Sequence, residues 1–457
     1  MNAAQALGRF ASAVRVTELD GVVRERLAWI VADTVAAIAA GSAEPEMRAL
    51  AAGHDSREVA TLVGCGRGAA AETAALVNGT AGTFLEMDEG NRFARGHAAI
   101  HVVPAALAAC EQAGADADTF LGAVIAGYEV CSRIAAASNL RGSMHPHGTW
   151  GTIGAAVACG RVAGLPPGHM QELIGISSSL MTATSKRTML EGGLVRNVYA
   201  GLANRNGLLA LQLLQAGFSA ENDGLRSMFG AVLSESFDEQ ALLAGLPDEA
   251  GTGGASGWHV MQNYFKLHSC CRYNHGTLDA LDQLDEAGQL PDVASVENVV
   301  VDTYGYAAEL DDPAPRNTLA AKFSVPFAVA SRLVHRSSGL SSFTWEAVRN
   351  PAVLALAARV TVREDPAMTR RLPQERPARV SIRLRDGSER TAQVTFNRGD
   401  DAAPYTSEQL TRKFLELTSR VWPLAHCQRV LDATLALGAG GTSMARWCDM
   451  LRHPPTQ

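Results

Sequence analysis

Residues 78–104 have the sequence NGTAGTFLEMDEGNRFARGHAAIHVVP, which surrounds one glycine-bearing loop with carboxylates and imidazoles. Glu86 and Asp88 close a run of small and apolar residues typical of a helix, and His97 and His101 follow the loop. Acids and histidines placed around one loop are what proton-transfer chemistry requires. The stretch therefore predicts closely packed helices with acid–base residues at a helix end.

The two acids admit two interpretations. Both can be surface carboxylates that pair with Arg92 or Arg95. Glu86 follows Phe84 and Leu85 on an apolar segment, so we expect its side chain to point inward. A partly buried acid near cations can act as a base or hold a histidine in one tautomer.

A second cluster occupies residues 144–149, with the sequence MHPHGT. His145 precedes a proline, which predicts extended backbone. Thr149 opens the next predicted helix, whose free N–H groups suit an anion. We therefore expect acid–base and binding roles for His145 and His147, although a capping loop with a surface histidine is the alternative.

A third cluster, KLHSCCRYNH, occupies residues 266–275. Apolar neighbours of Lys266 predict partial burial, where a lysine can neutralise a carboxylate or lower its own pKa, unless it is an ordinary surface lysine. Cys271 is a candidate nucleophile, but a buried structural thiol is commoner. Arg272 is a candidate carboxylate ligand, and no Ser-His-Asp spacing supports acyl transfer.

Composition limits the class of protein. A chain of 457 residues with 47% hydrophobic and 19% charged residues predicts a folded protein of two domains. The net charge of -7 argues against nucleic acid, and local clusters of cations in an acidic protein suit a small anionic ligand. No signal peptide or membrane span is expected, because Asp33 interrupts the most apolar early segment. The 8 scattered cysteines predict reduced thiols and a cytoplasmic location.

The pattern changes near Gly257, from helices to a mixture of strands and helices. Strands are predicted at 296–304 and 360–363, a hairpin around Asp386-Gly387, and helices at 319–334 and 407–421. We therefore predict a mainly α protein, with a large all-helical domain formed by residues 1–263 and 408–457 and a smaller α+β lid domain formed by residues 264–407.

Two cofactor motifs are weak. Residues 59–70, VATLVGCGRGAA, resemble a dinucleotide fingerprint, but the glycine spacing is wrong and a glycine-dependent turn is expected. His97 and His101 have a spacing that suits zinc, but no HExxH motif or third ligand at fixed spacing accompanies them. We predict neither a cofactor nor a metal.

Taken in order, these segments resemble the MmgE/PrpD family over nearly the whole chain. The matching segments are 78–89, 97–104, 127–130, 145–151, 200–207, 266–275 and 322–326. The resemblance implies a large helical domain made from both termini, a smaller α+β lid and a homodimer. It also implies chemistry without metal, iron–sulfur cluster or nucleotide, which begins with proton abstraction beside a carboxylate.

The resemblance also assigns residues. His97, His145 and Lys266 match positions that line the family's active site, and Glu86 falls where many members have aspartate. The expected substrate-binding residues are Arg196, Arg272, His147, Tyr199, Cys271 and Thr149.

Some residues depart from the family's pattern. Arg196 stands where dehydratase- and decarboxylase-like members have lysine, and Tyr199 where they often have histidine. Cys271 stands where the decarboxylases have histidine, and no tyrosine matches theirs near Ala308. Arginine in place of lysine keeps carboxylate binding but removes a proton donor.

The resulting prediction is an enzyme that abstracts a proton α to a carboxylate of a small di- or tricarboxylate. His145 or Lys266 takes the proton, and the other, or His97 paired with Glu86, returns it or protonates a leaving group. The outcome is dehydration, as in 2-methylcitrate dehydratase, or epimerisation, as in iminodisuccinate epimerase. A cis-aconitate-type decarboxylase and a non-catalytic polycarboxylate-binding relative are the alternatives.

Overall fold

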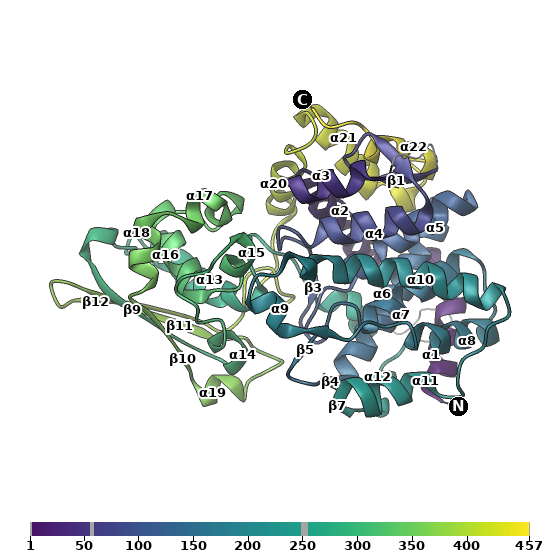
Figure 1. The fold of residues 1–457 in the computed structure, drawn as a ribbon, viewed down its shortest axis with the longest axis horizontal. Coiled ribbons are helices and arrows are strands. Elements are labelled where there is room, and N and C mark those ends of the chain that lie inside the picture. The colour runs from purple at the N-terminus through teal and green to yellow at the C-terminus, as the bar shows by residue number, and fades with distance from the viewer. Residues whose placement is uncertain (1, 55–58, 248–254, 457) are drawn as a thin grey trace.

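The computed structural model describes residues 2–54, 59–247 and 255–456, and it has two lobes of unequal size (Figure 1). The larger lobe is built from helices, and the smaller lobe packs helices on a four-stranded sheet. The larger hydrophobic core runs from Ala3 to Phe265 and resumes at Leu410. The smaller core lies between Cys270 and Val394, with Met189 added to it. Both chain ends therefore belong to the larger lobe, and the fold is mainly α as predicted.

The larger lobe contains a layered set of helices. Its main members are α1 (Ala3–Ala13), α2 (Gly21–Ser42), α3 (Pro45–Ala52), α4 (Ala71–Gly82), α5 (Val103–Ala113), α6 (Ala117–Ala137), α7 (Trp150–Val162), α8 (Pro167–Ser178), α10 (Val198–Gln215), α12 (Glu239–Leu243), α20 (Ser407–Thr418), α21 (Leu424–Leu435) and α22 (Met444–Leu451). Helix α6 is long and apolar enough to span a membrane, but 94% of its most apolar 18-residue window is buried inside the protein. Its apolar character therefore serves the core.

Small residues let the central helices approach closely. A Cβ atom on Gly154 of α7 would lie 2.7 Å from the Cβ of Cys131 on α6. A Cβ on Gly151 would lie 2.3 Å from the His101 ring, at the 3₁₀ turn Ala99–His101. Side chains at these positions would force α7 away from α6 and from the histidine loop.

The smaller lobe is an α+β unit. Its sheet has the order β10 (Val360–Glu364), β9 (Val296–Thr303), β11 (Ala378–Leu384) and β12 (Glu389–Val394), with β9 parallel to β10 and antiparallel to β11. The helices of this lobe are α13 (Arg272–Glu286), α14 (Gly305–Ala308), α15 (Thr318–Lys322), α16 (Val325–His335), α17 (Trp345–Val348), α18 (Pro351–Ala357) and α19 (Pro366–Thr369). The predicted turn joins β11 to β12, and Gly387 supplies its left-handed residue at φ 85°.

Several local predictions need correction. The helix expected at 319–334 is two helices, because the Ser324 side chain accepts from Phe327 N–H and caps α16. Helix α4 ends at Gly82, so Glu86 and Asp88 lie in an irregular segment beyond it.

The fingerprint-like stretch is an antiparallel hairpin of β1 (Ala60–Leu62) and β2 (Arg67–Ala69). Gly64 and Gly66 have φ values of 73° and 70°, which the hairpin's turn requires. The expected glycine-dependent turn is confirmed.

The C-terminal helices hold the acidic segment in place. Lys413 of α20 is buried, forms an ion pair with Asp33 of α2, and donates to the carbonyl of Met87 at 2.7 Å. A residue far along the chain thus fixes the backbone between Glu86 and Asp88.

Candidate active site

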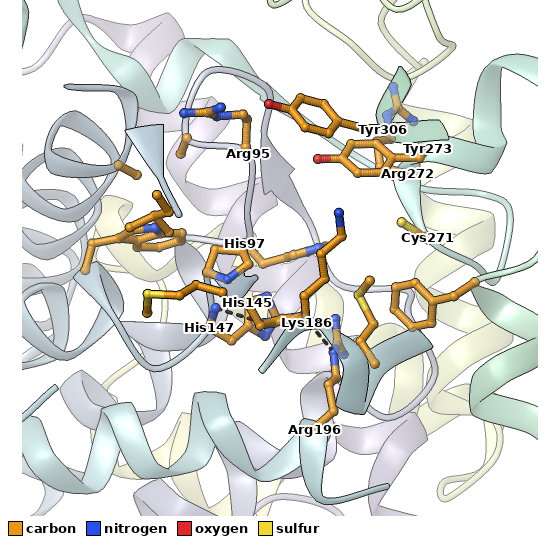
Figure 2. Close-up of a pocket in the computed structure, with 18 of the residues that line it drawn as sticks. Arg95, His97, His145, His147, Lys186, Arg196, Cys271, Arg272, Tyr273 and Tyr306 are labelled. Carbon is orange, nitrogen blue, oxygen red and sulfur yellow. Dashed lines mark hydrogen bonds between the residues drawn. The ribbon is translucent and has the colours of Figure 1, made fainter. Parts of the chain in front are cut away.

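A cavity of about 160 Å³ lies between the two lobes and collects side chains from all three sequence clusters (Figure 2). His97, His145 and His147 come from the larger lobe, and Cys271, Tyr273 and Tyr306 lie on the opposite side. Further wall residues are Glu86, Arg95, Lys186, Arg196, Tyr264, Arg272 and Arg376. The cavity is therefore rich in cations and imidazoles.

Short strands bring the clusters together. Strand β3 (Gly90–Asn91), which follows the acidic segment, pairs with β8 (Asn263–Tyr264), which leads to Lys266. Strand β5 (Met144–His145) pairs with β6 (Thr184–Ser185), and the 3₁₀ turn Leu194–Asn197 that carries Arg196 lies further along the chain.

His97 is held by a carboxylate and a carbonyl. Its Nδ1 lies 2.7 Å from the backbone oxygen of Glu89 and 3.1 Å from Oδ2 of Asp88. Both partners are acceptors, so Nδ1 carries the proton. Nε2, which has no partner in the described part of the chain, is left to a ligand. Asp88 thus orients His97, in place of the surface pairing with Arg92 or Arg95.

Glu86 stands between two cations. It forms ion pairs with Arg196 and with Lys266, whose Nζ lies 3.3 Å from Oε2 and donates to the Glu86 carbonyl at 3.1 Å. Burial opposes ionisation of Glu86, but Arg196 and Lys266 outweigh burial and lower its pKa. Its φ of 54° is unusual for a residue other than glycine, and these contacts hold the strained backbone.

Lys266 is fixed in its charged form. Its side chain is fully buried, and its Nζ lies 3.7 Å from Oδ1 of Asp88. Burial would lower the pKa of Lys266, but Glu86 and Asp88 more than offset burial and raise it. Lys266 is absent from the residues that line the cavity, so it supports Glu86 and Asp88 from behind. These contacts argue against Lys266 as the base.

His145 has donors at both ring nitrogens. The backbone N–H of His147 points at Nδ1 from 3.1 Å, and Nε–H of Arg196 points at Nε2 from 3.3 Å. Burial, followed by the charge of Arg196, lowers the pKa of His145 well below its usual range. A neutral imidazole has one acceptor nitrogen, so one of these two contacts is unsatisfied. The backbone N–H is the less mobile donor, which favours the proton on Nε2.

One guanidinium nitrogen of Arg196 is available to a ligand. Its Nη1 contacts Glu86 and lies 3.3 Å from Oδ1 of Asn197, and its Nε faces His145. Nη2 has no hydrogen-bond partner in the described part of the chain. A guanidinium nitrogen in this position is a donor for a carboxylate.

The histidines from two clusters form one group of rings. The His147 ring lies 5.2 Å from that of His97 and 4.7 Å from those of His101 and His145, all edge to face. Burial lowers the pKa of His101 to about 4, and that of His147 well below its usual range. Burial therefore keeps these imidazoles neutral beside Arg196.

Comparison with known proteins identifies the fold. A family model described as the MmgE/PrpD N-terminal domain matches residues 5–238, and one described as the MmgE/PrpD C-terminal domain matches residues 268–437. The chain belongs to the MmgE/PrpD family. The predicted membership is thereby confirmed.

Curated relatives cover almost the whole chain. A cis-aconitate decarboxylase of Aspergillus terreus is 26% identical over 94% of this chain and 91% of its own length. A cis-aconitate decarboxylase-like protein of Aspergillus oryzae is 24% identical over 95% of this chain and 94% of its own length. The family and these names indicate an enzyme, and leave its reaction open.

Most, but not all, of the site residues expected from the MmgE/PrpD resemblance line the cavity. The expected site residues that line it are Glu86, His97, His145, His147, Arg196, Cys271 and Arg272. Tyr199 and Thr149 do not line it: the Tyr199 ring lies 5.8 Å from that of His145, and the Thr149 hydroxyl donates to the Pro146 carbonyl at 2.6 Å. Burial, followed by Glu86, raises the pKa of Cys271 to about 11, which disfavours a thiolate nucleophile.

Arg272 has a divided role. Its Nη2 donates to Asp400 at 2.8 Å, and its guanidinium lies 4.4 Å from the centre of the Tyr264 ring. Because these contacts engage its guanidinium, Arg272 mainly holds the wall of the MmgE/PrpD cavity in place and is not a free cation for a ligand.

Sequence reasoning missed several wall residues of this MmgE/PrpD site. Asp88, which contacts His97 without lining the cavity, was weighed as a surface acid, although its position near His97 in the sequence gave a signal. Lys186, Tyr306 and Arg376 lie outside the three clusters, so no local pattern marks them. Tyr306 lies two positions before Ala308, where no matching tyrosine was found.

Two other groups of polar side chains in this MmgE/PrpD protein resemble a metal site and a catalytic triad. Ligand atoms of Glu86, Asp88 and His97 lie within 4.8 Å of one another, but Arg196 and Lys266 already balance these carboxylates. Ser338, His268 and Asp279 form a hydrogen-bonded line with distances of 2.6 and 3.1 Å, which the sequence spacing did not predict. Those three residues do not line the cavity.

Proposed function

We propose that this MmgE/PrpD protein is a cofactor-independent enzyme that moves a proton next to a carboxylate of a small di- or tricarboxylate. The observation that carries the proposal is the pairing of His97, which lines the cavity together with Arg196, with the buried carboxylate of Asp88 at 3.1 Å. A carboxylate that orients a histidine is a recurring arrangement for general acid–base catalysis.

His97 is the proposed base. Because Nδ1 donates to the Glu89 carbonyl and faces the Asp88 carboxylate at 3.1 Å, the lone pair of Nε2 is available to accept a proton from the substrate carbon. Asp88 then stabilises the imidazolium that forms. This assignment moves the base from His145 or Lys266 to His97, with Lys266 as a fixed counter-charge.

Arg196 and His145 form the proposed anion site. A carboxylate between them accepts from the free Nη2 of Arg196 and from Nε2–H of His145. Such a ligand removes the donor conflict between Nε–H of Arg196 and the His145 ring. The same donors stabilise the negative charge that spreads onto the carboxylate oxygens when the α-proton leaves.

Two outcomes follow from the common carbanion. If the carbanion expels a β-hydroxyl group, the C–O bond breaks, a C=C bond forms and water leaves after protonation. If a proton returns to the opposite face, the product is the epimer. Dehydration and epimerisation share the first step, and in dehydration the proton that His97 has taken leaves with the hydroxyl group as water.

Decarboxylation is the second candidate, favoured by the similarity to named cis-aconitate decarboxylases over 94% of the chain. In that reaction the C–C bond to a carboxylate breaks, carbon dioxide leaves, and protonated His97 delivers a proton to the carbanion. Cys271 and Arg196, which differ from the residues expected of decarboxylases, weigh against it.

The test is proton NMR in heavy water with 2-methylcitrate, citrate, cis-aconitate, malate, tartrate and iminodisuccinate. New vinyl signals from a hydroxy acid establish dehydration, and an α-proton signal lost without an alkene establishes epimerisation. Conversion of cis-aconitate with release of carbon dioxide establishes decarboxylation.

Variants locate the chemistry. His97→Gln should abolish all turnover and α-proton exchange, whereas His426→Gln, which changes a histidine of α21 that does not line the cavity, should retain both. His145→Ala should weaken substrate binding and slow exchange. Unchanged exchange in His97→Gln would contradict the proposed base.

A further inference from the structure

A second cavity of about 580 Å³ adjoins the first on the side of the smaller lobe. Arg95, Tyr273, Tyr306 and Arg376 line both, so the two spaces share a wall. Figure 2 shows Tyr273 and Tyr306 together on the side of the inner cavity away from Arg196. We call the first space the inner cavity and the second the outer cavity.

Two buried donors at the outer cavity have no partner. Arg376 is 3% exposed, and its Nη2 donates to the Arg92 carbonyl at 2.8 Å, but its Nη1 has no hydrogen-bond partner in the described part of the chain. Tyr304 is 2% exposed, and its hydroxyl also has none there. Buried polar groups are normally paired, so two unpaired donors at one cavity call for a ligand or water that accepts from both.

The charge of the outer cavity is positive. Arg95 and Arg376 line it, and among the described residues they donate to amide or backbone oxygens and pair with no carboxylate. Among the described residues that line it, Glu309 alone is acidic, and Glu309 is paired with Lys186 across the two lobes. An anionic group placed there meets uncompensated guanidinium charge.

The remaining walls of the outer cavity are flat and apolar. The rings of Tyr273 and Tyr306 stack at 6.0 Å with 17° between their planes, and the Tyr304 ring meets Tyr273 edge to face at 5.8 Å. Phe93, Ala136, Leu372 and Pro373 add further apolar surface to the lining. These surfaces suit an apolar spacer.

We infer that the outer cavity binds the distal carboxylate of an elongated dicarboxylate whose other carboxylate occupies the inner cavity at Arg196. Arg376 and the Tyr304 hydroxyl donate to the distal carboxylate, and the spacer lies along Tyr273 and Tyr306. The inference rests on the proposed function only in taking the inner cavity as a carboxylate site. The substrate is then longer than the inner cavity alone would hold.

The test is calorimetric titration of the protein with succinate, adipate, suberate and sebacate. A ligand that spans both cavities gives an affinity maximum at one chain length, with one molecule bound per chain. Tyr304→Phe should weaken binding of that ligand about tenfold, because one hydrogen bond to a charged group is lost, and should leave succinate binding unchanged.

Thermal unfolding of the free protein separates a binding role from a structural one. Tyr304→Phe should not lower Tm, because among the described residues the hydroxyl has no hydrogen-bond partner to lose. Tyr128→Phe is the matched control: that hydroxyl donates to Glu89 Oε2 at 3.2 Å in the core, so its loss should lower Tm. A similar fall in Tyr304→Phe would overturn the inference.

Three further outcomes would also overturn the inference. They are affinity that does not depend on chain length, a length maximum that Tyr304→Phe leaves in place, and two short acids bound per chain. Because binding is measured without turnover, these results do not depend on which reaction the inner cavity catalyses. A length maximum in a protein that turns over no substrate would support the outer site and contradict the proposed function alone.

Discussion

Replacement of Asp88 by asparagine is the sharpest test of the His97 assignment. Asp88→Asn removes the charge that lies 3.1 Å from Nδ1 of His97 and keeps the shape of the side chain. The amide cannot stabilise an imidazolium as a carboxylate does, so we expect kcat to fall.

The structure sets the size of that fall. Where a carboxylate alone fixes the histidine tautomer, its replacement by an amide costs about 10⁴-fold in kcat. Here the Glu89 carbonyl also accepts from Nδ1, at 2.7 Å, and it remains in the variant. Only the electrostatic support is lost, so we expect a fall of about 10²-fold, equivalent to about 2.7 kcal/mol of transition-state stabilisation.

The assay is steady-state turnover together with α-proton exchange in heavy water. Glu129→Gln is the control for loss of a buried carboxylate, because Glu129 is fully buried, pairs with Arg133 at 3.3 Å and does not line the cavity. It should destabilise the fold without a specific loss of kcat. An Asp88→Asn enzyme with unchanged kcat would refute the role of the pair, and one as inactive as His97→Gln would refute the role of the Glu89 carbonyl.

Three further changes test the surroundings of the cavity. Arg196→Lys should raise KM about tenfold with a smaller change in kcat, since a planar bidentate donor becomes a point charge; steady-state kinetics would check this. Lys413→Met should lower the free energy of unfolding by about 3–5 kcal/mol in urea, because Asp33 loses its buried partner. Burial raises the pKa of Glu89 to about 8, so the folded protein holds an extra proton and wild-type stability falls as pH rises from about 4.3 to 8. Glu89→Gln should remove that slope and gain up to about 1.4 kcal/mol per pH unit relative to wild type across this window, as measured by urea unfolding at each pH.

Much of the fold follows from local sequence pattern. The β-branched run at Val296–Thr303 and the Asp386-Gly387 turn predicted the sheet of the smaller lobe, because strand and turn chemistry are local. The break before α16 was missed, since the apolar pattern continues through Ser324 and only the capping geometry interrupts it.

The site was less predictable than the fold. Three clusters were recognised from residue type, but their contacts depend on pairings such as β3 with β8, which join residues far apart in the chain. Whether Lys266 faces the cavity or stands behind Glu86 is set by tertiary packing, and so is the direction of its pKa shift. Arg376 carries no local signal, because it lies just before β11 in the smaller lobe and reaches the cavity only through the fold.

The distribution of charge suggests how an anion enters. The charges around the inner cavity are balanced, because the carboxylates of Glu86 and Asp88 offset the cations of Arg196 and Lys266. The buried histidines beside these four residues are held neutral. Uncompensated positive charge therefore lies further out, at Arg95 and Arg376. In a chain with a net charge of -7, those two arginines provide the attraction for an anionic substrate, and the inner donors orient it. Because attraction between separated charges is screened by salt and buried hydrogen bonds are not, substrate capture should weaken with ionic strength more than the chemical step does.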